Sequence, residues 1–319
     1  MITPAIYTLL TKWADPDKRS RMISIVYVGK AIGAIVSNYT SSWICSSYKI
    51  GGWPMSYYIY SMFGAVLSII WITGVSESPD QDKRKSQTIT PNKSIPLYDI
   101  FTSKPVWAIA IAKFASNFGY YFLLIEAPTL FSTILGVDVR TIGYLTLIPN
   151  CTIVVTGLLF AAAADYIIQQ KYLSILNTRK LFVLLGFGIS SACFCAVVFA
   201  GHSVVVVEIL YIVISAVYGC NYASVLPNPM DITIEYSGVV AGVTQTIVSC
   251  SGFLLPIVIG LVINEENTLK QWILLFLITG GVELFGMFFF LIFAEAEQQE
   301  WSSNNEHIEE EKRSLINRK

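Results

Sequence analysis

The 319-residue chain has a net charge of −1, and 54% of its residues are hydrophobic while only 13% are charged. A soluble domain usually carries about a quarter charged residues, so this composition excludes an ordinary soluble enzyme. The near-neutral charge and the lack of a basic stripe in the sequence also argue against nucleic acid as a partner, because phosphate binding needs clustered Lys and Arg.

Eight apolar segments are long enough to cross a bilayer as helices, which need roughly 20 residues each. In chain order, the predicted spans are 22–47, 53–75, 105–131, 141–164, 181–201, 203–226, 237–263 and 271–293. Gly201-His202-Ser203 separates the fifth span from the sixth and predicts a tight helical hairpin. Residues 3–13 look like the last turns of a further helix. The sequence therefore predicts an all-α, multi-pass protein of the lipid bilayer.

One long polar stretch, 76–104, interrupts the apolar spans and contains three prolines and a basic cluster. We expect it to be a cytoplasmic linker, since most of the 21 Lys and Arg fall on the same side as this stretch and basic loops stay in the cytoplasm. The predicted organisation is an N-terminal bundle at 1–75, the linker at 76–104, a six-helix bundle at 105–293 and a cytoplasmic tail at 294–319.

The residues that usually carry catalysis are scarce. The six cysteines lack the spacing of a zinc site, and the two histidines are too few for a His-based metal cluster or hydrolytic site. We therefore expect no enzymatic activity, no metal and no cofactor.

A series of short motifs runs along the chain, and their order and spacing resemble those of a known family. They are Pro4-Ala5, Trp13-Ala14-x-Pro16-x-x-Arg19-Ser20, Val75-Ser76-Glu77-Ser78-Pro79, Pro105-Val106-Trp107-Ala108-Ile109, Gly143-x-Leu145-x-x-x-Pro149, Ala164-Asp165, Asn228-x-x-Asp231-Ile232-x-x-x-Tyr236-x-Gly238-x-x-x-Gly242 and Phe293-Ala294-x-x-Glu297. Together they are similar to the anion-cation symporter family of the major facilitator superfamily, which includes sialin, the vesicular glutamate transporters and the sodium-phosphate cotransporters.

The resemblance implies a fold and a function. The eight spans would be family spans five to twelve, giving a major facilitator superfamily bundle with a complete C-terminal half and the last part of the N-terminal half. The implied function is secondary active transport of an organic or inorganic anion, of the sialate, glutamate, phosphate or urate class, with a proton or sodium ion as coupling ion. Because family spans one to three would be missing, we expect transport by this chain to be impaired. The resemblance does not distinguish among a lysosomal, a vesicular and a plasma membrane as the location.

Two other kinds of protein share parts of this pattern. A non-transporting multi-pass scaffold would have the same hydropathy, and a receptor-like protein is weakly suggested by Asn228-Pro229. Measured flux of a small anion would separate a carrier from both.

The candidate substrate site lies mainly on the span at 105–131. Lys113, Asn117, Tyr120 and Tyr121 follow one another at i, i+4, i+7 and i+8, so they share one helical face with donors that an anion would favour. Lys113 could instead reach the headgroups, and the tyrosines could be interfacial packing residues. By the resemblance, Tyr7 takes the place of a histidine in proton-coupled members, and its hydroxyl can donate to an anion.

Three further residues are candidates for a gate or for ion coupling. Lys30 and Glu126 are ionisable groups inside spans, where a charge is costly and is read as functional by default. Either could instead lie at the headgroups. Asp165 resembles the end of the superfamily's loop motif, whose aspartate caps and pairs at the cytoplasmic gate. Glu283, deep in the last span, is expected to hydrogen-bond to a neighbouring helix rather than to contact substrate.

Overall fold

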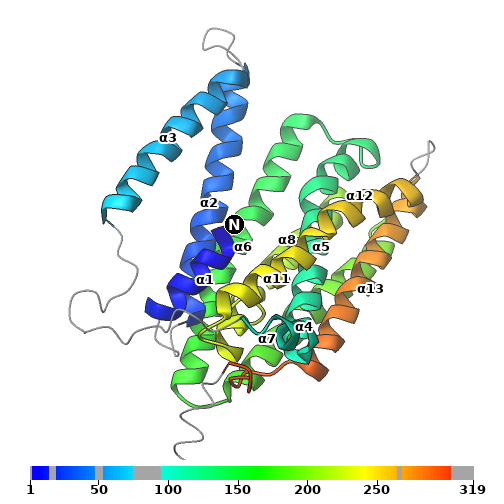
Figure 1. Ribbon diagram of the computed structural model, residues 1–319. Helices are drawn as coiled ribbons and strands as arrows, with labels where there is room; N and C mark the ends of the chain where they lie inside the picture. The colour runs from blue at the N-terminus through cyan, green and yellow to red at the C-terminus, as the bar shows by residue number, and fades with distance from the viewer. Residues whose placement is uncertain (1, 14–18, 47–52, 75–94, 264–267, 303–319) are drawn as a thin grey trace, which may run out of the picture. The chain divides into compact units, whose positions relative to one another are not determined.

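The computed structural model describes residues 2–13, 19–46, 53–74, 95–263 and 268–302, and its regular structure in these residues is helical (Figure 1). The elements are α1 (Ile2–Trp13), α2 (Arg19–Ser46), α3 (Trp53–Gly74), α4 (Leu97–Thr102), α5 (Lys104–Thr133), α6 (Val139–Gln169), α7 (Ile175–Ala196), the 3-10 helix η4 (Val197–Phe199), α8 (Val204–Tyr218), α9 (Cys220–Ala223), α10 (Asn228–Ile232), α11 (Ser237–Ser249), α12 (Ser251–Val262) and α13 (Leu269–Phe293). The all-α prediction is confirmed.

Within the described residues, 7 stretches of helix are long and apolar enough to cross a membrane. They are Pro54–Gly74, Lys104–Thr133, Thr141–Gln169, Ile175–Phe199, Val204–Ile232, Ser237–Val262 and Leu269–Phe293. Each corresponds to one of the predicted spans. The remaining predicted span, 22–47, is the 28-residue helix α2, which is long enough but less apolar because it carries many Ser, Thr and Asn residues.

The chain forms two compact units. One contains residues up to 24 together with those from 94 onward, and the other contains residues 25–93. In the second unit, α2 and α3 are joined by the Tyr60 hydroxyl, which contacts Thr40 and donates to the carbonyl of Ser37 at 3.1 Å. The predicted division at 75 and 104 stays a prediction, since most of the linker lies outside the described residues.

The hairpin predicted at Gly201 is present. The helical stretch of α7 and η4 ends at Phe199, a turn follows, and α8 begins at Val204. Gly201 has a φ of +56°, which side chains with a Cβ rarely adopt. A glycine at this position therefore lets the chain reverse between two spans.

The C-terminal end of the predicted linker is ordered. Residues 97–102 form the short helix α4, and Ile100 is completely buried in a cluster with Val106 and Ile109. The indole nitrogen of Trp107 donates to the Phe101 carbonyl at 2.7 Å. These contacts explain why this part of the polar stretch docks on the bundle.

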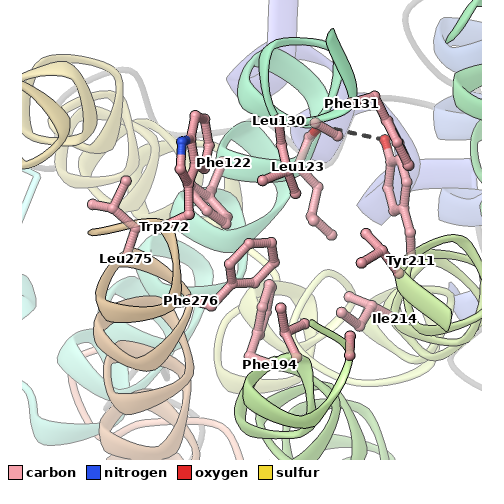
Figure 2. Close-up of a cluster of buried hydrophobic side chains, with 14 of the residues drawn as sticks. Phe122, Leu123, Leu130, Phe131, Phe194, Tyr211, Ile214, Trp272, Leu275 and Phe276 are labelled. Atoms are coloured by element: carbon pink, nitrogen blue, oxygen red, sulfur yellow. Dashed lines mark hydrogen bonds between the residues drawn. The ribbon is translucent and has the colours of Figure 1, made fainter. Parts of the chain in front are cut away.

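Aromatic packing joins α5, α7, α8 and α13 into one core. Phe122 meets Phe276 edge to face with centroids 5.0 Å apart, and Phe194 packs near both rings (Figure 2). Trp272 is almost fully buried in the same cluster. The Tyr211 hydroxyl donates to the Leu123 carbonyl at 3.4 Å, which ties α8 to α5.

The short helix α1 packs against α11 (Figure 1). A Cβ at Gly238 would collide with the Thr8 hydroxyl and lie 3.0 Å from the Pro4 carbonyl oxygen, while one at Gly242 would touch the Pro4 ring at 3.5 Å. The two glycines are four residues apart and lie on the same face of α11. This small-residue face lets the helix backbones approach closely.

We expect Gly238→Ala to loosen α1. The added methyl group overpacks the α1–α11 contact, which typically costs about 1–3 kcal/mol, so α1 amides should exchange their hydrogens faster in lipid nanodiscs. Gly260→Ala in α12 is the matched control because a Cβ there meets open space. That control should leave α1 exchange unchanged, and equal effects of the two substitutions would contradict the close packing.

Candidate functional site

Lys113 is buried between α5 and α1. It lies in the third turn of α5, and only 8% of its surface is exposed. Its Nζ donates to the Tyr7 hydroxyl at 3.4 Å and lies 5.0 Å from the centre of the same ring. The side chain therefore points toward α1.

Tyr7 links Lys113 to a break in the helical span Val204–Ile232. Its side chain is fully buried, and its hydroxyl donates to the Leu226 carbonyl at 2.6 Å. Leu226 lies in the turn between α9 and α10, so its carbonyl is available to a donor from another helix. Lys113, Tyr7 and Leu226 form a short polar chain across α5, α1 and this turn.

The charge on Lys113 is not neutralised by a carboxylate within the described residues. Its hydrogen-bond partner is a phenol that already donates its single hydrogen to Leu226. A buried cation with only neutral partners loses much of its hydration without a compensating ion pair. Such a group favours the approach of an anion.

The other predicted substrate residues on α5 contact different helices. Asn117 donates from Nδ2 to the Ser251 hydroxyl at 2.8 Å, at the start of α12. Tyr120 packs edge to face on Tyr218 of α8 with centroids 6.5 Å apart, and its ring lies 6.1 Å from that of Tyr121. The structure thus brings Lys113 and Tyr7 together, while Asn117 and Tyr120 are held by α12 and α8.

Asp165 is buried near the end of α6 and accepts a hydrogen bond from the backbone N–H of Arg21 at 2.8 Å. Arg21 is in the first turn of α2, where backbone N–H groups lack helical partners and the helix dipole favours negative charge. The carboxylate therefore caps the N-terminus of α2. Capping is the kind of contact that the loop-motif resemblance implies for Asp165.

The remaining two predicted gate residues are less defined. Glu126 is half-buried on α5, two residues before Pro128. Lys30 lies in helix α2, and its side chain falls outside the described residues.

A buried ion pair joins α7 to α10, and sequence reasoning assigned it no role. Arg179 Nε donates to Asp231 Oδ2 at 2.9 Å, with both side chains at most 2% exposed. Arg179 Nη1 also donates to the Ala223 carbonyl at 2.8 Å, at the end of α9. Asp231 lies within one of the family motifs, but nothing in the sequence indicates that it pairs with Arg179.

Glu283 is fully buried on α13 and contacts hydroxyl groups of two other helices. These are Ser190 on α7 and Tyr218 on α8. The expected hydrogen bond to a neighbouring helix is therefore confirmed.

Comparison with known proteins agrees with the resemblance seen in the motifs. Residues 1–256 match the family model described as Major Facilitator Superfamily. Human sialin is 30% identical over 318 residues, covering 95% of this chain and 63% of sialin. Vesicular glutamate transporter 3 of Danio rerio is 28% identical over 334 residues (98% and 55%), and vesicular glutamate transporter 1 of Bos taurus is 26% identical over 328 residues (96% and 57%). The chain spans less than two thirds of the length of these relatives.

Proposed function

The chain belongs to the Major Facilitator Superfamily, and from this membership we propose that it takes part in secondary active transport of a small organic or inorganic anion. It is an integral multi-pass membrane protein, and 7 helical stretches among its described residues are long and apolar enough to cross a bilayer. The relatives that are named for what they move are glutamate transporters. This supports an anionic cargo of the glutamate, sialate, phosphate or urate class rather than an enzymatic reaction.

The buried ammonium group of Lys113 is the single observation that carries this proposal. In a site of low dielectric constant, a charge attracts an opposite charge much more strongly than it does in water. Lys113 has the Tyr7 hydroxyl as a neutral partner, and the bond between them, at 3.4 Å, is long. An incoming carboxylate or phosphate oxygen would supply the counter-charge that Tyr7 does not.

We propose that Asn117, Tyr120 and Tyr121 complete the substrate site. Asn117 can offer its second amide hydrogen while the first is bound to Ser251. The tyrosine hydroxyls are further donors on the same face of α5. The anion would then be bound by one cation and several neutral donors, with a proton or sodium ion as the coupling ion.

Alternating access supplies the mechanism that we propose for movement of the anion. In this mechanism, one helical half moves against the other around a central site. The contacts of Tyr7 with Leu226 and of Asp165 with Arg21 each join a helix of the N-terminal part to the C-terminal bundle. Each contact rests on a hydrogen bond that can break and re-form, as a gate requires. Lys30 and Glu126 are further candidates for a gate or for ion coupling.

In this proposal, anion binding depends on Lys113 and its neighbours, which lie within one compact unit.

Reconstitution of the 319-residue chain tests this function. Equilibrium binding of labelled L-glutamate, sialate, phosphate and urate is measured in lipid nanodiscs, with tetraethylammonium as the cation control. We expect at least one anion to bind and the cation not to bind. Binding of the cation without any anion would overturn the assignment.

A further inference from the structure

Glu283 lies in the middle of its span, far from both ends of α13. At 1.5 Å per residue it is about 21 Å from Leu269 and about 15 Å from Phe293. Its side chain is completely buried. The two hydroxyl partners, Ser190 and Tyr218, also lie well inside their spans. A carboxyl group in this position is expensive to keep charged.

Four helices build the space around this carboxyl. Glu283 comes from α13, Ser190 from α7 and Tyr218 from α8, while α5 contributes Gly119. A Cβ at Gly119 would collide with both the Tyr218 hydroxyl and the Glu283 carboxyl oxygen Oε1. The missing side chain therefore makes room for the hydrogen-bonded pair.

The number of hydrogens in this cluster fits a protonated carboxyl. Ser190 Oγ contacts both the Phe187 carbonyl oxygen, at 3.2 Å, and Glu283 Oε2, yet a hydroxyl has one hydrogen to donate. If Ser190 donates to Phe187, its oxygen can only accept from Glu283, and the carboxyl must carry a hydrogen on Oε2. The Tyr218 hydroxyl meanwhile donates to Oε1. One added proton thus satisfies all three contacts.

The same cluster can also hold the carboxylate. Ser190 then turns its single hydrogen from the Phe187 carbonyl to Oε2, and Tyr218 continues to donate to Oε1. Because Phe187 and Ser190 are both in α7, this exchange needs only rotation of a hydroxyl. The site therefore has two complete hydrogen-bond arrangements that differ by one proton.

The titratable groups around Glu283 offer no cation to pair with it among the described residues. Cys193 of α7 interacts electrostatically with the carboxyl, and Tyr211 of α8 with Tyr218. Tyr120 of α5 packs edge to face on Tyr218, and its ring lies near that of Tyr121. The cations on these helices lie elsewhere or are engaged elsewhere: Lys113 contacts Tyr7, Arg179 is paired with Asp231, and Lys104, Lys180 and Lys270 lie in the first two turns of their helices. Of the other ionisable groups, Cys195 lies near Gly280, Glu208 is in the second turn of α8, and Glu126 is two residues before Pro128 on α5.

We propose that Glu283, Ser190 and Tyr218 form a proton-binding site at the centre of the C-terminal bundle, and that its proton is coupled to binding of the anion. The second part rests on the proposed transport function. The proton enters and leaves at Glu283 Oε2, and Ser190 and Tyr218 stabilise both forms. No hydrogen bond or ion pair joins Glu283 to Lys113 or Asn117 among the described residues, so the proton and the anion would occupy separate sites.

Infrared difference spectroscopy tests proton binding without any need for transport. The wild-type chain and Glu283→Gln are compared in lipid nanodiscs from about pH 5 to about pH 9, a range that covers the values documented for buried carboxyls. We expect a C=O stretching band of a protonated carboxylic acid that is lost in Glu283→Gln, shifts in D2O and disappears reversibly at high pH. Glu235→Gln is the matched control, since Glu235 is exposed and its replacement should leave the band unchanged.

A second variant keeps the test valid if Glu283→Gln folds poorly. Tyr218→Phe removes the hydrogen bond donated to Oε1, so the acid band should move to higher wavenumber while the helical circular dichroism is unchanged. The proposal is overturned if the wild type shows no Glu283 acid band at any pH. It is also overturned if the band persists unchanged at high pH.

Linkage between the two sites tests the coupling. Affinity for labelled L-glutamate should be higher at acidic than at alkaline pH in the wild type and independent of pH in Glu283→Gln, because coupling between two sites is reciprocal. An unchanged pH dependence in Glu283→Gln would overturn the coupling. If the wild type binds no member of the anion panel, the proposed transport function fails, while the infrared band still decides whether Glu283 binds a proton.

Discussion

Replacing Lys113 with alanine is expected to weaken anion binding by roughly 10- to 150-fold, the equivalent of a charge-assisted hydrogen bond worth about 1.5–3 kcal/mol. Among the described residues, the buried ammonium of Lys113 has the neutral Tyr7 hydroxyl as its hydrogen-bond partner. A bound anion would therefore supply the counter-charge. Lys113→Arg should restore part of the affinity because the charge is kept, although the planar guanidinium fits a point-charge site less well. Equilibrium binding of the anion that the wild type recognises measures the effect.

The matched control for Lys113→Ala is Lys270→Ala. Lys270 is exposed at the start of α13, so its loss should leave binding unchanged. Membrane insertion of Lys113→Ala should be intact, since removing a charge makes a span easier to insert. Normal binding by Lys113→Ala would exclude Lys113 from the substrate site.

Chemical labelling distinguishes a substrate-site Lys113 from one that reaches the headgroups. A cysteine is placed at residue 113 in a chain whose native cysteines have been replaced, and a thiol reagent is added with and without the anion. A substrate site predicts that the anion protects this cysteine. Labelling from the cytoplasmic side without any protection would support the headgroup alternative.

Breaking the Arg179–Asp231 pair is expected to have the largest effect on stability. Asp231→Leu leaves the Arg179 guanidinium buried without its carboxylate, and removal of one partner from such a pair typically costs about 3–5 kcal/mol. Arg179→Leu should be similarly destabilising because it removes the same ion pair and also the hydrogen bond to the Ala223 carbonyl. Denaturant unfolding in detergent, followed by circular dichroism, measures both variants.

The double variant Arg179→Leu/Asp231→Leu provides the critical comparison. With both charges gone, no uncompensated ion remains, so the double variant should be clearly more stable than the sum of the two single effects predicts. Glu235→Gln, an exposed carboxylate change between α10 and α11, should have little effect. Additive losses in the double variant would show that the two side chains are not energetically coupled.

Hydropathy alone could predict the membrane spans because a lipid bilayer restricts the structures that a spanning segment can adopt. Inside a bilayer the backbone must satisfy its own hydrogen bonds, so a long apolar segment has little alternative to a helix. The same reasoning placed the hairpin at Gly201, where a flexible residue interrupts apolar sequence. It was less effective for α2, whose many small polar residues lower its hydropathy, and for α4, where one buried isoleucine docks a short helix in an otherwise polar stretch.

Which residues meet across the bundle could not be predicted in this way. A helix face against lipid and a face against another helix are both apolar, so the period of hydrophobic residues does not show how a span is rotated. The face of α5 that carries Lys113, Asn117 and Tyr120 was visible in the sequence, but their separate partners on α1, α12 and α8 were not.

The sequence by itself determined the all-α membrane fold, the order of the long helices that the structure describes, and the family. These depend on length, hydropathy and local motifs. Only the tertiary structure decided that Arg179 pairs with Asp231 and that Glu283 meets Ser190 and Tyr218. These contacts join residues far apart in the sequence. A polar group in an apolar environment needs a hydrogen-bond or ionic partner, and the packing of whole helices determines which residue supplies it.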